Sequence, residues 1–357
     1  MNHDATSLAQ IIAFLVAIMV LAQACADEGL FESLGRRVDL LSRGSSMRLL
    51  ALSVVFAAVV TAVLSLDATV VLLTPILIAA SATHPYTSHA YASVRLSNSA
   101  STLLPVSNLT NLLAFSATGL TFVGFTRAMF PVWVAAIALE YLALRWWFRD
   151  ELRQPYDAPG TPVTAVPLFP LAVVIVVLLG LAGGATPVIP AAAGAILLSG
   201  YALFRRTTTW ADLLAAANIP FAAFVFVWAL VVSALGSTFV GDWFDDALPS
   251  GTGLGALIAI ALIAMIAANI VNNLPATLLL LPAATIAGPA AILALLIGVN
   301  VGANLTMIGS LANLLWRQSG GRELSTVRGF HTLGFATTPF IVVACTVVLW
   351  GWTSLIW

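Results

Sequence analysis

The chain has 357 residues, of which 61% are hydrophobic and only 8% are Asp, Glu, Lys or Arg, with a net charge of −1. Soluble domains carry about 25% charged residues, so this composition excludes a water-soluble globular fold. All fourteen basic residues are Arg, which excludes a P-loop nucleotide-binding site because that loop needs Lys.

Ten apolar segments follow one another, and runs such as 8–26 lack the alternating pattern of a β-strand. Only helices and closed barrels satisfy their backbone hydrogen bonds in lipid, so we predict an all-α integral membrane protein. The segments lie at residues 8–26, 49–82, 88–118, 128–147, 166–183, 187–204, 215–235, 254–286, 290–316 and 333–356.

Segments 49–82 and 254–286 each carry polar residues near the middle, and no polar loop divides either segment. Each arm has ~14–18 residues, or roughly 21–27 Å of helix. That length is short for a hydrocarbon core of ~30 Å. We therefore predict a re-entrant helical hairpin in each segment.

The segments that follow the hairpins, 88–118 and 290–316, are interrupted by Gly, Pro and small polar residues. Non-helical backbone at membrane depth is tolerated only where protein or water encloses it. Each of these segments is therefore predicted to be a discontinuous transmembrane helix.

The two halves of the chain resemble each other. NSASTLLPVSNLTNLL (98–113) and NVGANLTMIGSLANLL (300–315) share six of sixteen residues without gaps. We predict two inverted repeats, an arrangement typical of secondary transporters. The first repeat, 1–157, holds a helix, hairpin 49–82, broken helix 88–118 and helix 128–147; the second, 158–357, holds helices 166–183, 187–204 and 215–235, hairpin 254–286, broken helix 290–316 and helix 333–356.

The arginines predict the orientation, because cytoplasmic loops retain basic residues. With eight crossings and both termini outside, twelve of the fourteen arginines fall on the cytoplasmic side of a plasma membrane. The second half carries two helices that the first half lacks. We expect either that helices precede this chain in a longer protein or that it is a shortened variant.

Asp67 is predicted to couple transport to protons or sodium, together with Ser65 and Thr69. A carboxylate near mid-membrane costs at least ~2.5–3.5 kcal/mol, so such residues usually serve a function. The alternative is a helix cap.

Neutral polar residues at the breaks are the predicted solute-binding groups, with helix–helix hydrogen bonding as the alternative. They are Asn98, Ser101, Thr102, Ser107, Asn108, Asn272, Asn273, Asn300, Asn304, Thr306 and Ser310.

Other ionisable residues are given structural roles. Glu140 is expected to pair with Arg145 or to reach the interface, and Arg95 to snorkel or pair. Cys25 and Cys345 are far apart in apolar sequence and indicate buried thiols, not a disulfide or a metal site. We expect no catalytic residues, metal, cofactor or nucleic-acid partner.

At these motifs the chain resembles the ion transporter superfamily and, within it, the arsenite efflux permeases. The resemblance is carried by DEGLFESLGRR (27–37), LSLDATVVLLTPILIA (64–79), SNSASTLLPVSNLTNLL (97–113), NIVNNLPATLL (269–279) and GVNVGANLTMIGSLANLLWR (298–317). It implies two inverted repeats with hairpins and broken helices, and export of arsenite or antimonite hydroxides in exchange for protons. It also allows a homodimer and a soluble ATPase partner. Several members carry an acid where this chain has Asn98 and Ser101.

We therefore expect a secondary transporter, not an enzyme, that moves a small inorganic solute. The alternatives are a sodium/proton antiporter or a dicarboxylate-type anion symporter of the same superfamily, and a passive channel.

Overall fold

The computed structural model describes residues 2–66, 69–74, 87–154, 165–220, 222–223, 226–227, 231, 248–249, 251–318 and 326–357. Within these ranges the secondary structure is helical and contains no strand, which confirms the all-α prediction. The chain forms two compact units, each drawn from both halves: a first unit of Met1–Arg37 and Gly160–Leu230, and a second unit of Val38–Pro159 and Val231–Trp357.

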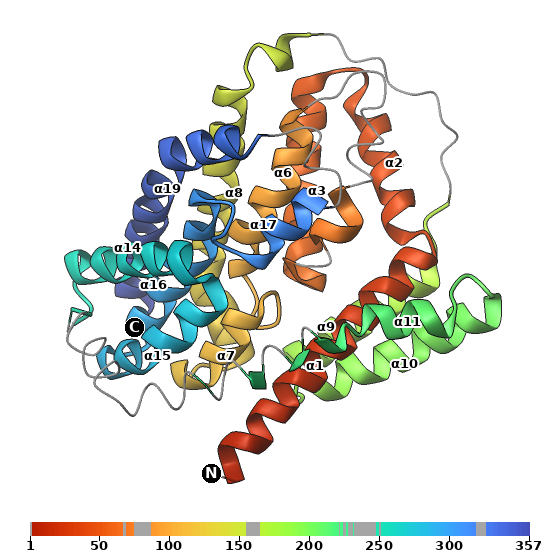
Figure 1. The fold of residues 1–357 in the computed structure, drawn as a ribbon, viewed down its shortest axis with the longest axis horizontal. Coiled ribbons are helices and arrows are strands. Elements are labelled where there is room, and N and C mark those ends of the chain that lie inside the picture. The colour runs from red at the N-terminus through yellow and green to blue at the C-terminus, as the bar shows by residue number, and fades with distance from the viewer. Residues whose placement is uncertain are drawn as a thin grey trace. The chain divides into compact units, whose positions relative to one another are not determined.

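The first unit is built on α1, which packs along α10 (Figure 1). Its helices are α1 (Asn2–Asp27), the start of α2 (Leu30–Ser42), α9 (Leu168–Ala182), α10 (Val188–Arg205) and α11 (Trp210–Ala216). Gly29 has a φ of 75°, in the region that favours glycine, and α2 turns away from α1 by 60°. The stretch between the predicted apolar segments 8–26 and 49–82 thus contains a helix.

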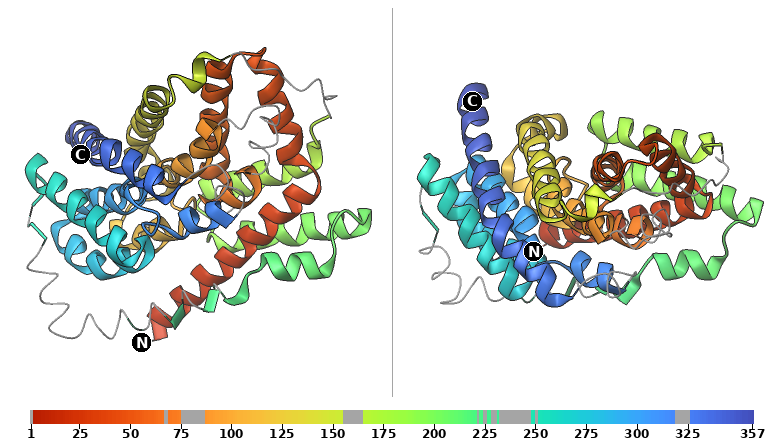
Figure 2. Two further views of the ribbon diagram at one scale, coloured as in Figure 1. Left: turned by 45° about the horizontal axis from the view of Figure 1, so that its top comes forward. Right: turned by 90° about the horizontal axis from the view of Figure 1, so that it is seen from above.

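The second unit contains both broken helices. Its elements are α3 (Ser46–Leu64), the π-helical turn η1 (Thr69–Leu73), α6 (Thr87–Ser99), η2 (Ala100–Thr102), α7 (Leu109–Thr118), α8 (Phe122–Trp147), η3 (Glu151–Arg153), α14 (Leu254–Val271), α15 (Asn273–Ala287), α16 (Pro289–Asn300), η4 (Val301–Leu305), α17 (Leu311–Trp316) and α19 (Val327–Ile356). Helix α16 is at its centre and contacts α14, α15, α7 and α19. Helices α8 and α19 pack against each other (Figure 2).

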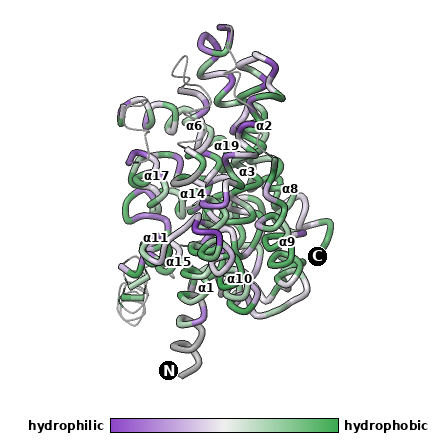
Figure 3. The backbone as a smooth tube through the Cα atoms, turned by 90° about the vertical axis from the view of Figure 1, so that its right-hand side faces the viewer, coloured by the Kyte–Doolittle hydropathy of each residue, from purple (hydrophilic) through white to green (hydrophobic). Residues whose placement is uncertain are grey.

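Five of the described helices are long and apolar enough to cross a bilayer: α3, α8, α10, α14 and α19, with the bent α1–α2 pair as a sixth. The hydropathy colouring of Figure 3 shows how α8 stays mostly hydrophobic along its length. The chain is therefore a multi-pass membrane protein. Eight crossings, the sidedness of the loops and the two sequence repeats stay predictions.

The discontinuous helices are present. In each case a helix passes into a short 3₁₀ turn, and a second short helix follows: α6–η2–α7 and α16–η4–α17. We call residues 100–108 the first break and residues 301–310 the second break. The helices that follow the two breaks, α7 and α17, begin at positions that the repeat alignment pairs, 109 with 311.

The polar middles of the two predicted hairpins interrupt helices. Ser65 ends α3 with a φ of 107°, and Asn272 separates α14 from α15 with a φ of 78°. Both values lie in a region that L-residues rarely adopt. Helices α14 and α15 pack against each other. Re-entry of either pair into the same side of the membrane stays a prediction, and residues 67–68 and 75–86 of the first pair lie outside the described ranges.

Gly298 gives a test of the packing around α16. A Cβ there would come within 2.2 Å of the Ala261 carbonyl oxygen in α14. We expect Gly298→Ala to lower the free energy of unfolding by about 1–3 kcal/mol, the usual cost of overpacking a core. Gly255→Ala, in α14 with no atom within 4 Å of its Cβ, is the control. It should be neutral or stabilising, and equal melting temperatures for the two variants in detergent would contradict this packing.

Candidate solute-binding site

The two breaks meet at asparagine side chains. Asn98 is the last residue but one of α6 and Asn300 the last of α16, while Asn111 lies in α7 and Asn313 in α17, and all four are fully buried. Asn98 Nδ2 donates to Asn313 Oδ1 at 2.7 Å, and Asn300 Nδ2 donates to Asn111 Oδ1 at 2.7 Å. The repeat alignment pairs 98 with 300 and 111 with 313, so these are one interaction made twice, reciprocally.

Asn111 and Asn313 also donate hydrogen bonds to backbone carbonyl oxygens of the breaks. Each donates through Nδ2 to two carbonyl oxygens of its own half, at aligned positions. Asn111 donates to Ser101 O at 2.7 Å and Leu104 O at 3.0 Å, and Asn313 to Ala303 O and Thr306 O, both at 2.9 Å. A helix break leaves carbonyls without donors, and the amides supply the missing hydrogen bonds inside the protein.

The first broken helix adds two further donors to Asn300. Asn108 Nδ2 and Thr110 Oγ1 each donate to Asn300 Oδ1 at 2.8 Å. Asn108 also caps α7 through its Oδ1, which accepts from Thr110 N at 3.2 Å, and it donates to Ser101 Oγ at 3.3 Å. The amide of Asn300 is therefore satisfied at both ends.

The amide of Asn98 is satisfied at one end only. Its Nδ2 donates to Val94 O, Asn304 Oδ1 and Asn313 Oδ1 at 3.3, 2.9 and 2.7 Å. In the described ranges no donor reaches Asn98 Oδ1, although that atom is buried. A buried acceptor left without a donor costs about 1–3 kcal/mol.

Beside the asparagines lies a buried ion pair. Arg95 Nε donates to Glu140 Oε2 at 2.5 Å, and both side chains are 0% exposed. Ser99 Oγ and Asn304 Nδ2 donate to Glu140 Oε1 at 2.7 and 3.0 Å. The expected pairing of Glu140 with Arg145 is wrong: α8 turns Glu140 into the core, while Arg145 is exposed.

The remaining guanidinium donors of Arg95 are also occupied. Nη2 reaches Glu140 Oε1 at 3.3 Å, Thr337 Oγ1 at 3.0 Å and Thr338 Oγ1 at 3.3 Å, and Nη1 reaches Asn304 O at 3.5 Å. Arg95 is the only buried Arg in the described part of the chain. The polar centre of the second unit is thus electrically neutral and is dominated by amides.

The structure brings five of the predicted solute-binding residues together. The hydrogen bonds above join Asn98 to Asn304, and Asn108 to Ser101 and Asn300, and Ser101 Oγ connects the two groups by donating to Asn98 O at 2.7 Å. With Asn111 and Asn313, the asparagines among them form a set that we call the asparagine cluster: Asn98, Asn108, Asn111, Asn300, Asn304 and Asn313.

The other predicted solute-binding residues make local contacts. Thr102 Oγ1 donates to Ser99 O, Ser107 Oγ to Ala62 O, Asn272 Nδ2 to Ile308 O and Thr306 Oγ1 to Asn269 Oδ1; Asn273 N donates to Gly309 O, and Ser310 Oγ accepts from Asn313 N as the cap of α17. They hold the breaks and the α14–α15 junction in place.

Of the predicted coupling residues, Ser65 and Thr69 are buried and joined, because Thr69 Oγ1 donates to Ser65 O at 2.9 Å. Thr61 Oγ1 donates to Thr69 Oγ1, also at 2.9 Å. Asp67 lies outside the described residues.

Sequence reasoning missed Asn111, Asn313 and the Arg95–Glu140 pair. The two asparagines are identities in the repeat alignment, and that signal could have found them. The ion pair had a weaker signal. Arg95 and Glu140 carry opposite charges within two predicted membrane segments, and buried charges need partners.

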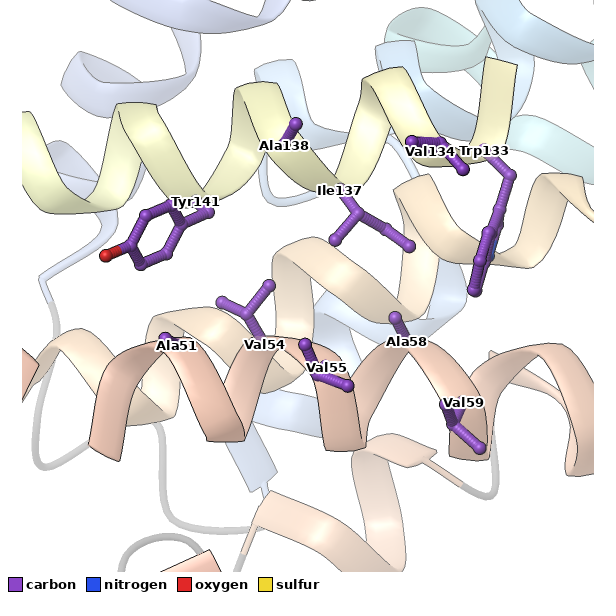
Figure 4. A pocket seen from close by; sticks show the side chains of 10 residues that line it. All are labelled: Ala51, Val54, Val55, Ala58, Val59, Trp133, Val134, Ile137, Ala138 and Tyr141. Atoms are coloured by element: carbon purple, nitrogen blue, oxygen red, sulfur yellow. The ribbon is translucent and has the colours of Figure 1, made fainter. Parts of the chain in front are cut away.

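An apolar groove lies elsewhere in the second unit, between α3 and α8 (Figure 4), with a volume of about 430 Å³. Its lining is Ala51, Val54, Val55, Ala58, Val59, Trp133, Val134, Ile137, Ala138 and Tyr141. Both helices are candidate membrane spans, and the lining offers few groups that could bind a polar solute. Within the described ranges, no group of three or more His, Cys, Asp or Glu could hold a metal ion.

An all-α membrane protein in which two discontinuous helices meet at a buried polar cluster has the architecture of a membrane transporter. The comparisons agree. The chain belongs to the CitMHS family, described as citrate transporters, whose model matches residues 5–292.

Among individual relatives, the arsenical pump membrane protein of Escherichia coli (strain K12) is 28% identical over 360 residues, covering 93% of this chain and 84% of the relative. The putative arsenical pump membrane protein of Bacillus subtilis (strain 168) is 25% identical over 350 residues, covering 85% and 78%. These matches confirm the resemblance to the arsenite efflux permeases.

Among solved structures, the Alcanivorax borkumensis YdaH transporter, described as having an unusual topology, matches with a TM-score of 0.59. The match covers 100% of this chain and 89% of that one at 15% identity. At that identity the similarity concerns the fold alone.

The ion pair predicts the effect of removing one partner. Arg95→Met leaves Glu140 buried without its cation, which typically costs about 3–5 kcal/mol. We expect a large drop in the melting temperature of the purified protein. The matched control is Arg145→Met, which makes the same substitution at an exposed position. It should change the free energy of unfolding by less than about 0.5 kcal/mol. Equal losses would show that Glu140 does not depend on Arg95.

Proposed function

We propose that this transporter exports neutral hydroxides of trivalent arsenic or antimony in exchange for protons. The observation that carries the proposal is the neutrality of the asparagine cluster. Amide groups recognise hydroxyls through hydrogen bonds, and the one buried Arg of the described residues is neutralised by Glu140. The names of the relatives point to the same solutes.

The family description points instead to citrate, an anion, and the cluster argues against it. Binding a carboxylate in a site shielded from water needs a free cation or several free donors. The donors of Arg95 are already directed at Glu140, Thr337, Thr338 and Asn304. The anion symporter therefore ranks below the exporter of neutral hydroxides.

Coupling is assigned to Asp67, with Ser65 and Thr69 as its neighbours in the chain. A carboxyl group can take up and release a proton, and an acid within a predicted membrane segment usually serves a function. The transporter is placed in the plasma membrane with its Arg-rich loops in the cytoplasm and both termini outside. A homodimer and a docked soluble ATPase belong to the same proposal.

Everted membrane vesicles test the function. Arsenite should accumulate when the vesicle interior is acidic. Asp67→Asn should abolish this dependence on the proton gradient. The control variant Asp150→Asn, at an exposed position, should leave the dependence unchanged. Uptake that follows sodium would support the antiporter or symporter, and competition by citrate would support the anion symporter. Flux that persists without a gradient would indicate a channel.

A further inference from the structure

We infer that Asn98 Oδ1 is the atom that receives a hydroxyl of the transported solute, so that the solute is bound from the first half of the pseudo-symmetric cluster and not from the second. This inference rests on the proposed function for the identity of the solute. It comes from hydrogen-bond accounting around two equivalent asparagines, Asn98 and Asn300.

The orientation of the Asn98 amide is determined by its neighbours. Asn313 donates through Nδ2 to two backbone carbonyls, so its Oδ1 is left to face Asn98. Asn304 donates through Nδ2 to Arg95 O at 3.0 Å and to Glu140 Oε1 at 3.0 Å, so its Oδ1 also faces Asn98. Two anchored acceptors require a donor between them, and only the Nδ2 end of Asn98 can serve both.

The equivalent atom in the second half is in a different position. Asn300 Oδ1 accepts from Asn108 Nδ2 and from Thr110 Oγ1, both at 2.8 Å. The repeat alignment pairs position 108 with Ser310 and position 110 with Ala312. Ala312 has no side-chain donor, and Ser310, whose Oγ accepts from Asn313 N, makes no hydrogen bond to Asn98 Oδ1. Neither of the two donors that Asn300 Oδ1 receives therefore has a counterpart at Asn98 Oδ1.

The chemistry of the open acceptor selects its ligand. A lone carbonyl oxygen attracts an O–H or N–H donor and repels a carboxylate oxygen, because both oxygens carry lone pairs. A neutral metalloid hydroxide carries such O–H donors. The surrounding groups add no free charge, since Arg95 and Glu140 are paired. A cation such as sodium is the competing ligand for an oxygen atom, and the test separates the two.

The test supplies the missing donor. Ala312→Thr places a hydroxyl at the position aligned with Thr110, and Ala312→Val has the same shape without the hydroxyl. Ala312 is fully buried, so both variants meet the same packing change. Melting temperatures of the purified protein are measured in detergent with increasing antimonite. The measurements are then repeated with sodium chloride replaced by choline chloride, which removes the sodium ion.

We expect antimonite to raise the melting temperature of the wild-type protein, because a ligand that binds the folded state stabilises it. Relative to Ala312→Val, Ala312→Thr should melt at a higher temperature without ligand and bind antimonite at least about tenfold more weakly. A hydroxyl that fills the ligand position raises the melting temperature and weakens antimonite binding, whereas structural damage would lower both the melting temperature and the affinity. Equal antimonite affinity in the two variants would overturn the inference and leave the proposed function standing.

If either variant fails to fold, Asn98→Leu and Asn300→Leu replace them, since each asparagine side chain makes three hydrogen bonds. The stabilisation by antimonite should be lost only in Asn98→Leu, and loss in both would overturn the inference. If sodium and not antimonite raises the melting temperature, and Ala312→Thr weakens that effect, then Asn98 Oδ1 binds a cation and the inference is overturned. A wild-type protein that does not respond to antimonite would reject the proposed function itself.

Discussion

The structure depends on the need of every backbone group inside a bilayer to find a hydrogen-bond partner within the protein. Breaking α6–α7 and α16–α17 frees carbonyl oxygens in each half, and Asn111 and Asn313 donate to them. An amide that donates with its nitrogen still presents an oxygen. Asn300 and Asn98 meet that oxygen from the opposite half. The repair of two separate helices therefore brings the breaks together, and the meeting point becomes the polar centre of the second unit.

The ion pair gives this centre its electrostatic character. A buried pair adds little to stability compared with apolar residues, because desolvation offsets the attraction between the charges. Its role here is geometric: Glu140 accepts from Ser99 of the first broken helix and from Asn304 of the second. It also leaves the asparagine cluster without a free charge. Under the proposed function, solute selection falls to amides and hydroxyls, which suit a neutral hydroxide better than an anion.

Much of the architecture followed from simple sequence patterns, whereas most of the contacts did not. Long apolar runs predicted the membrane helices. Small polar residues within those runs predicted the breaks, because non-helical backbone at membrane depth is tolerated only where protein or water encloses it. The repeat alignment located Asn98 and Asn300, but it does not say which side chains face each other across the halves. Arg145 is not the partner of Glu140 because the two lie five residues apart, and only residues three or four apart share a helix face, while Arg95 is distant in sequence and near only in the folded unit. The division into two units, which mixes both halves, had no local signature at all.

The most direct test of the account is a double-mutant cycle across the breaks, on Asn111 and Asn300. Free energies of unfolding are measured for Asn111→Ala, Asn300→Ala and the double variant. If the side chains pair directly, the double variant loses less stability than the two single variants together, by about 0.5–2 kcal/mol. A second cycle that joins Asn300→Ala to Thr332→Ala, at an exposed position of α19, should be additive. Additive losses for Asn111 and Asn300 as well would mean that the two breaks do not meet through these amides, and the shared site would have to be abandoned.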